Sequence, residues 1–152
     1  MRPAPATLAS MGLFGRRDDD TTFPKEDRGA GDLGQYDYAL RARRKGTVIR
    51  LAGSDPHQEE LRAVLEAGDA VIETAMSPRT MQQEGVDAPI EVRLFADRRV
   101  SGVVGQVPRG LESIVDDTLR RLEDSGLKPR IPARIVQKRG ALRVELLMGA
   151  VR

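Results

Sequence analysis

The hydrophobic pattern of the chain predicts an α+β fold, a small curled antiparallel sheet or barrel with two covering helices. Roughly six segments alternate apolar and polar residues as strands do, and only about two have helical periodicity, too few helices for a doubly wound α/β sheet. The 152 residues suit one domain. Because aromatic residues make up only 3% of the chain, its core must be built from Val, Leu, Ile, Ala and Met.

Residues 1–34 have neither helical nor strand periodicity. They hold three prolines, five glycines and the charged block Arg16-Arg17-Asp18-Asp19-Asp20. A segment of this composition has almost no apolar surface to bury. We therefore expect a disordered N-terminal tail that the fold does not require.

Residues 35–45 join this tail to the rest of the chain. Tyr36, Tyr38 and Leu40 occupy alternate positions ahead of a basic run. This pattern fits either a strand arm or a basic linker. The globular domain is then expected to comprise residues 46–150.

The domain is expected to open with a strand and a helix. The apolar run Val48 to Leu51, closed by Gly53, predicts the strand. Asp55 and Pro56, with Gln58 three residues after Asp55, resemble a capping box at a helix start. One face of this helix carries three apolar residues, and a glycine ends it: Leu61, Val64, Leu65 and Gly68.

A second strand is expected over residues 70–75, followed by a polar loop over residues 77–88. Next comes a hairpin, because Ile90, Val92 and Leu94 alternate with charged residues and a turn through Asp97-Arg98-Arg99 leads into the apolar stretch 100–107. Gly105 in that second strand is expected to permit a bulge or a close backbone approach. Pro108 stops the strand.

The strongest helical pattern spans residues 110–125. Apolar residues recur at intervals of three and four, and Gly126 provides the stop: Leu111, Ile114, Val115, Leu119 and Leu122. The acidic pairs of this helix, Asp116-Asp117 and Glu123-Asp124, are expected on its solvated face, with Asp116 and Arg120 as a weak ion pair. A last hairpin turns at Arg139-Gly140, with Ile131, Ala133 and Ile135 before it and Leu142, Val144, Leu146 and Met148 after it.

Composition excludes several kinds of chemistry. The chain has no cysteine, so disulfides, thiol nucleophiles and Cys-based metal sites are ruled out. The single histidine, His57, has no second titrating partner fixed by the sequence, so we expect no catalytic residues, no metal and no cofactor. No stretch approaches the ~20 apolar residues of a membrane span, and the N-terminus has no secretory pattern, so we expect a cytoplasmic protein without membrane contact.

Charge is distributed unevenly along the chain. Residues 47–87 carry 3 basic and 8 acidic side chains, whereas residues 88–152 carry 13 basic and 8 acidic ones. In the last hairpin Arg134 and Arg143 are expected to share one face, opposite Ile135 and Val144, while Lys138 and Arg139 flank the turn. Together with Lys128 and Arg130, these cations form a stripe that suits a phosphate backbone.

Several short strings, taken in order, resemble a divergent HIRAN domain over residues 46–149. They are the opening Val48-Ile49-Arg50-Leu51-Ala52-Gly53, the following His57 and Gln58, the strand Pro89-Ile90-Glu91-Val92, the element Val104-Gly105-Gln106-Val107-Pro108-Arg109 before a helix, and the closing Pro132-Ala133-Arg134-Ile135-Val136. The family's Asn-Pro-Tyr-Asp-x-Asn-Ala stretch, whose Tyr-Asp pair helps to hold a DNA 3′ end in eukaryotic members, is replaced here by residues 85–89.

This resemblance implies a barrel related to OB and SH3-like barrels that binds through a groove and does not catalyse. The groove positions that still carry a polar group are His57, Gln106 and Arg109. His57 and Arg109 suit contact with phosphate, although His57 would equally well be solvated. The free N–H groups where the following helix begins would also suit an anion.

Two functions follow from these observations. The first is weak, sequence-tolerant binding of DNA or RNA through the basic groove, with His57, Gln106, Arg109, Arg134, Lys138, Arg139 and Arg143 as the contact residues. The second is a protein-interaction or adaptor domain, which the acidic 47–87 region and the missing Tyr-Asp pair favour. An oligonucleotide-binding experiment over a salt series separates the two functions.

Overall fold

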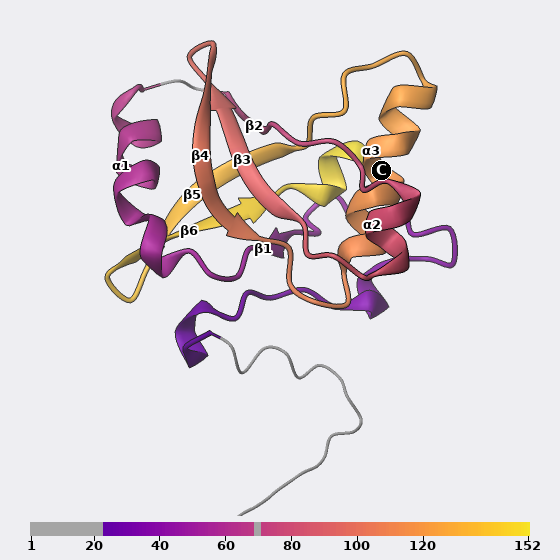
Figure 1. The fold of residues 1–152 in the computed structure, drawn as a ribbon, viewed down its shortest axis with the longest axis horizontal. Coiled ribbons are helices and arrows are strands. Elements are labelled where there is room, and N and C mark those ends of the chain that lie inside the picture. Colours follow the sequence, from indigo (N-terminus) through magenta and orange to yellow (C-terminus); the bar gives the residue numbers. More distant parts are fainter. Residues whose placement is uncertain (1–22, 69–70) are drawn as a thin grey trace, which may run out of the picture.

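Six antiparallel strands form one curled sheet in the order β1-β6-β5-β2-β3-β4, which confirms the predicted α+β fold (Figure 1). This computed structural model describes residues 23–68 and 71–152. The strands are β1 (Ile49–Arg50), β2 (Ile72–Thr74), β3 (Glu91–Ala96), β4 (Arg99–Gln106), β5 (Pro132–Lys138) and β6 (Ala141–Leu146). Both predicted hairpins are present, and their turn residues Arg98, Arg139 and Gly140 have the positive φ angles of tight turns.

The two outer strands of the sheet meet and close it into a half-barrel. Just beyond β1, Ala52 exchanges two backbone hydrogen bonds of 2.8 Å with Gln106 at the end of β4. Gly105 makes this approach possible, because a Cβ at that position would lie 2.9 Å from the carbonyl oxygen of Ala52 and from Ser54 Oγ. The close backbone approach predicted for Gly105 is confirmed.

Helix α1 (Gln58–Glu66) follows a short 3-10 turn, η5 (Asp55–His57). Its residues Leu61 and Val64 are buried, but Leu65 is 44% exposed. The predicted capping box is wrong: the side chain of Asp55 caps no N–H, and the amide of Gln58 instead donates to the carbonyl oxygens of Ser54 and Leu142 and accepts from the Leu142 N–H. Gln58 therefore ties α1 to strand β6.

Two further helices lie together on the other side of the sheet from α1 (Figure 1). Helix α3 (Glu112–Asp124) follows its predicted pattern and buries Ile114, Val115 and Leu119 completely. Helix α2 (Met81–Gly85) lies in the segment expected to be a polar loop. Its start is a capping box, in which the Thr80 side chain accepts from the Gln83 N–H and the Gln83 side chain accepts from the Thr80 N–H.

Residues 23–34 were expected to belong to a disordered tail, but the structure packs them against the domain. Asp27 in the 3-10 turn η3 (Lys25–Asp27) is buried, and Ala30 pairs with Arg50 along the outer edge of β1. After the 3-10 turn η4 (Leu33–Gln35), Tyr36 pairs with Ala42, and both side chains are buried. The Asp27 carboxylate thus fixes part of a segment whose composition looked too polar to pack, and Tyr36 anchors the arm that follows it. The first 22 residues of the expected tail lie outside the described part of the chain.

Leu119→Ala should reduce the free energy of unfolding by about 2–5 kcal/mol, because it leaves a cavity beneath α3. Denaturation in urea measures this change. Leu127→Ala is the matched control, since Leu127 is 59% exposed just beyond the same helix. A loss below ~1 kcal/mol for Leu119→Ala would contradict the packing of α3 on the sheet.

The Tyr36 hydroxyl makes no hydrogen bond to any described residue, and burial raises the pKa of Tyr36 to about 12. The unfolded state therefore ionises first, so this residue's contribution to stability is complete below pH ~10 and is lost as pH rises towards ~12. We expect Tyr36→Phe to flatten the fall in melting temperature over this pH range. Tyr38→Phe, at a fully exposed position, should leave the wild-type profile unchanged; equal profiles for all three proteins would contradict the prediction.

Candidate nucleic-acid interface

The predicted basic residues of the last hairpin lie on the sheet surface that faces away from the core. Ile135 pairs with Val144 on the inner side, which places the alternate positions of β5 and β6 outside. Arg134 and Arg143 therefore share one face, as predicted. We define the outer face as the outward side chains of β1, β5 and β6: Arg50, Arg134, Val136, Lys138, Arg143 and Glu145.

Arg143 on this face is buried and engaged by two carboxylates. Its Nη1 lies 2.6 Å from Oδ1 of Asp27 and 2.8 Å from Oδ1 of Asp55. Asp27 also accepts hydrogen bonds from the backbone N–H groups of Ser54 and Asp55, at 2.7 and 2.8 Å. Arg143 is thus occupied by the chain's own acids and does not face solvent as a free cation.

Arg134 is paired but remains open to solvent. Its Nε lies 2.7 Å from Glu145 Oε1, and Arg50 approaches the other oxygen of Glu145 at 3.9 Å. The Arg134 side chain is 57% exposed, and its two Nη groups make no hydrogen bond to any residue that the structure describes. A second anion can therefore still reach Arg134.

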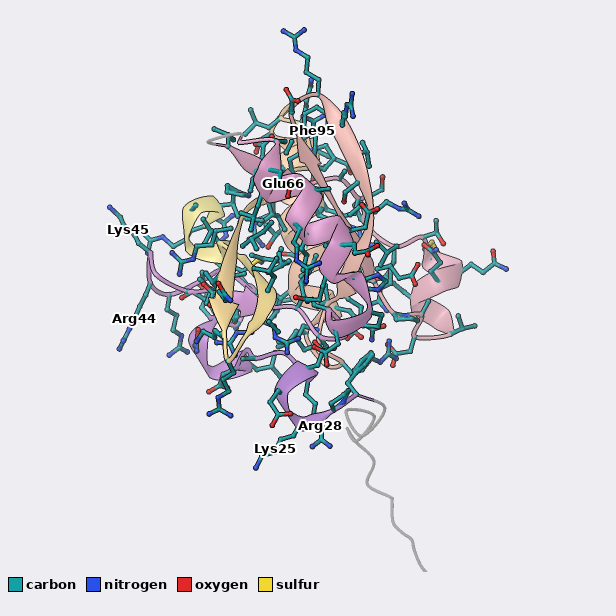
Figure 2. The ribbon with its side chains drawn as sticks, turned by 90° about the vertical axis from the view of Figure 1, so that its left-hand side faces the viewer. Lys25, Arg28, Arg44, Lys45, Glu66 and Phe95 are labelled. Atoms are coloured by element: carbon teal, nitrogen blue, oxygen red, sulfur yellow. The ribbon has the colours of Figure 1, made fainter. Side chains whose placement is uncertain are left out.

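Lys138 and Arg139 at the β5–β6 turn are exposed and have no ion pair within the described ranges. The turn η3 adds Lys25 and Arg28, which point away from the body of the molecule in Figure 2. Arg28 uses its Nε to bind the carbonyl oxygen of Phe23 at 3.0 Å. These four side chains are exposed cations around the outer face.

The outer face carries a net positive charge when it is taken together with residues 25–28, the turn residue Arg139 and the Arg143 partner Asp55. Seven cations meet four carboxylates: Lys25, Arg28, Arg50, Arg134, Lys138, Arg139 and Arg143 against Glu26, Asp27, Asp55 and Glu145. No aromatic ring belongs to this set. The surface therefore suits phosphates and offers no platform for stacking bases.

The three groove residues implied by the family resemblance do not lie on the outer face. Gln106 closes the sheet through its backbone, as described above. His57 ends η5, where its backbone N–H donates to the Ser54 carbonyl oxygen at 2.9 Å and its imidazole makes no hydrogen bond to any described residue. Arg109 binds Asp87 at 2.8 Å and Glu112 at 2.9 Å. The structure thus places His57, Gln106 and Arg109 on other elements than Arg134, Lys138, Arg139 and Arg143.

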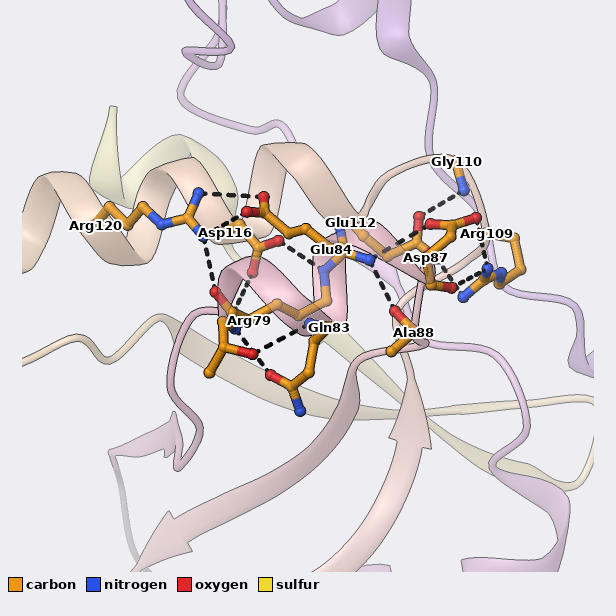
Figure 3. Close-up of polar contacts among 11 residues, drawn as sticks. Arg79, Gln83, Glu84, Asp87, Ala88, Arg109, Gly110, Glu112, Asp116 and Arg120 are labelled. Atoms are coloured by element: carbon orange, nitrogen blue, oxygen red, sulfur yellow. Dashed lines mark hydrogen bonds and ion pairs between the residues drawn. The ribbon is translucent and has the colours of Figure 1, made fainter.

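Arg109 belongs to a charged cluster that joins α2 to α3 (Figure 3). At its centre Asp116, fully buried, accepts from the backbone N–H and from Nε of Arg79, both at 2.8 Å. Burial alone would lower the pKa of Arg79, but the hydrogen bond and charge of Asp116 outweigh it and raise that pKa. The cluster contains Arg79, Glu84, Asp87, Arg109, Glu112, Asp116 and Arg120.

Two sequence-based expectations about this helix are wrong. Asp116 is not on the solvated face of α3, and its partner is Arg79 and not Arg120, which instead pairs with Glu84 at 3.2 Å. At the helix entry, Glu112 accepts from the Gly110 N–H at 2.8 Å, so this N–H is not available to an anion. With three arginines and four carboxylates, the cluster has no excess positive charge to attract a phosphate.

Comparison of the chain with protein-family models, curated proteins and solved structures finds no match. Within residues 23–68 and 71–152, no helix is long and apolar enough to cross a membrane. The same ranges contain no group of three or more His, Cys, Asp or Glu side chains placed to hold a metal ion.

Asp27→Ala should destabilise the fold by about 3–5 kcal/mol, because it removes one of the two carboxylates that hold the buried Arg143. Chemical denaturation of the full chain measures this loss. Glu26→Ala is the matched control, because this exposed neighbour should change stability by no more than about 0.5 kcal/mol. Equal stability of the two variants would mean that residues 23–34 do not contribute to the fold.

Proposed function

We propose that this protein is a non-enzymatic module that binds nucleic acid weakly through the backbone phosphates. The observation that carries the proposal is the excess of cations over carboxylates on the outer face and η3. Such an excess attracts phosphates and releases their counterions. Lys25, Arg28, Arg134, Lys138 and Arg139 are the residues we expect to make the contacts.

The proposed binding does not depend on base sequence or on a free strand end. Phosphate contacts position a nucleic acid but do not read its bases, and the outer face has no aromatic ring for stacking. We also propose that the fold is HIRAN-like and that the protein acts in the cytoplasm. The order of strands, helices and turns supports the first of these proposals, whereas the 3′-end contacts of the family have no counterpart at residues 85–89.

A protein-interaction role is the second candidate, and one observation favours it. On α2 and just after it, Met81 is 87% exposed and Val86 is 75% exposed. Two large apolar side chains exposed on the short connection between β2 and β3 form the kind of surface that a protein partner covers. Failure of oligonucleotide binding at low salt would favour this role.

The proposed binding predicts that the two cations of the β5–β6 turn govern salt dependence. Lys138→Gln with Arg139→Asn removes both charges, and Asn tolerates the positive φ of Arg139. If each cation meets one phosphate, the slope of log affinity against log salt for a single-stranded oligonucleotide should flatten by about 1.4, with equal weakening for all sequences. Fluorescence anisotropy over a salt series measures both quantities.

The β3–β4 turn offers a matched control. Arg98 and Arg99 are also exposed at a tight turn, and Arg98 has a positive φ like Arg139. Arg98→Asn with Arg99→Gln removes the same charge from a hairpin outside the outer face. An equal loss of affinity in both double variants would point to net charge alone and would contradict the proposed interface.

A further inference from the structure

The carboxylate of Asp27 occupies a site built by other parts of the chain. We call this the Asp27 pocket: Nη1 of Arg143 and the backbone N–H groups of Ser54 and Asp55, all within 2.6–2.8 Å of the carboxylate oxygens. One donor comes from β6, one from Ser54 just before η5 and one from Asp55, the first residue of η5. A guanidinium and two convergent N–H groups are donors that bind phosphate oxygens as readily as they bind a carboxylate.

The Asp27 pocket is held in place without help from Asp27. Ser54 Oγ donates to the carbonyl oxygen of Val104 at 2.8 Å, which ties the loop to β4. Asp55 holds Arg143 from a second side at 2.8 Å. The donors would therefore keep their positions, and Arg143 would keep a partner, if the Asp27 carboxylate left.

The segment that delivers Asp27 is attached to the body of the protein at few points. We call residues 23–34 the N-terminal strap. Besides the contacts of the Asp27 carboxylate, three backbone hydrogen bonds join the strap to the rest of the described chain: the Gly53 N–H donates to the Asp27 carbonyl oxygen at 2.9 Å, and Ala30 pairs with Arg50 at 3.1 and 2.8 Å. Lys25, Glu26 and Arg28 around Asp27 are exposed. A ligand that competes for the Asp27 pocket must therefore also break these three backbone hydrogen bonds and separate Gly29 and Gly31 from the residues they approach closely, Arg50 and Leu111.

We propose that the Asp27 pocket is an oxyanion site that the chain fills with its own carboxylate, and that a phosphate group takes its place when the strap moves away. A backbone phosphate of bound nucleic acid is the macromolecular source of this group, and that part of the inference rests on the proposed function. Free phosphate offers the same chemistry. In either case Asp27 competes with the ligand, so the strap limits binding to the outer face.

The first test uses inorganic phosphate and the full-length chain. Asp27→Ala should gain about 3 °C in melting temperature at a phosphate concentration roughly ten times the dissociation constant, with chloride keeping ionic strength constant. The melting temperature of the wild type should rise no more than that of the double variant Asp27→Ala/Arg143→Met, which lacks both the carboxylate and the guanidinium. Equal gains in the single and double variants would overturn the oxyanion site. If Asp27→Ala does not melt cooperatively, Asp27→Asn, which keeps the shape and removes the charge, serves the same comparison.

The second test uses a labelled single-stranded oligonucleotide and distinguishes the source of the phosphate. Asp27→Ala, or Asp27→Asn in its place, should bind it about tenfold more tightly than wild type, an effect of the size expected for one well-placed charged contact. A gain with inorganic phosphate but no oligonucleotide binding by any variant would leave the oxyanion site standing and overturn the proposed nucleic-acid function. Oligonucleotide binding that is unchanged by the Asp27 variants would support that function and overturn the role of the strap.

Discussion

The guanidinium of Arg143 is a buried charge on the outward side of a sheet, and the fold has to neutralise it. Burying a cation without a partner costs several kcal/mol of folding free energy. The fold must therefore place carboxylates beside Arg143. Asp55 supplies one of them from the turn before α1, and Asp27 supplies the other from the N-terminal strap. The same Asp27 carboxylate accepts the N–H groups of Ser54 and Asp55, so one interaction sets the path of the strap, the entry into α1 and the outer surface of β6.

Local pattern was enough to predict most of the fold. The alternation in β3 reflects one buried face, and the three-and-four spacing of Ile114, Val115 and Leu119 reflects one buried helix stripe. Contacts between distant residues were not predictable in this way. Asp27 and Arg143 are separated by 116 residues and Arg79 and Asp116 by 37, and nothing in the neighbourhood of either acid marks it as buried. The sequence of the short helix α2 does contain the residues of a capping box, Thr80 and Gln83. The polar composition of the segment favoured a loop instead.

The candidate interface was predictable in its geometry but not in its charge. A two-residue period places Arg134 and Arg143 on one face whatever lies opposite them. Whether each arginine is available depends on acids contributed by other strands and turns: Glu145 leaves Arg134 largely exposed, whereas Asp27 and Asp55 enclose Arg143. The pairing of Arg109 with Asp87 was not predictable for the same reason, because Asp87 comes from the β2–β3 connection, 22 residues earlier in the chain.

Stability and ligand binding place opposing demands on Asp27. Its three contacts hold the strap and neutralise Arg143, so a stronger strap gives a more stable fold. The same contacts occupy the donors that an external phosphate would use, so a stronger strap also means weaker binding at that point. Lys138 and Arg139 escape this conflict because they lie at a turn and stabilise nothing by pairing. The outer face therefore combines accessible cations, which set the long-range attraction, with one buried arginine whose availability depends on the position of the strap.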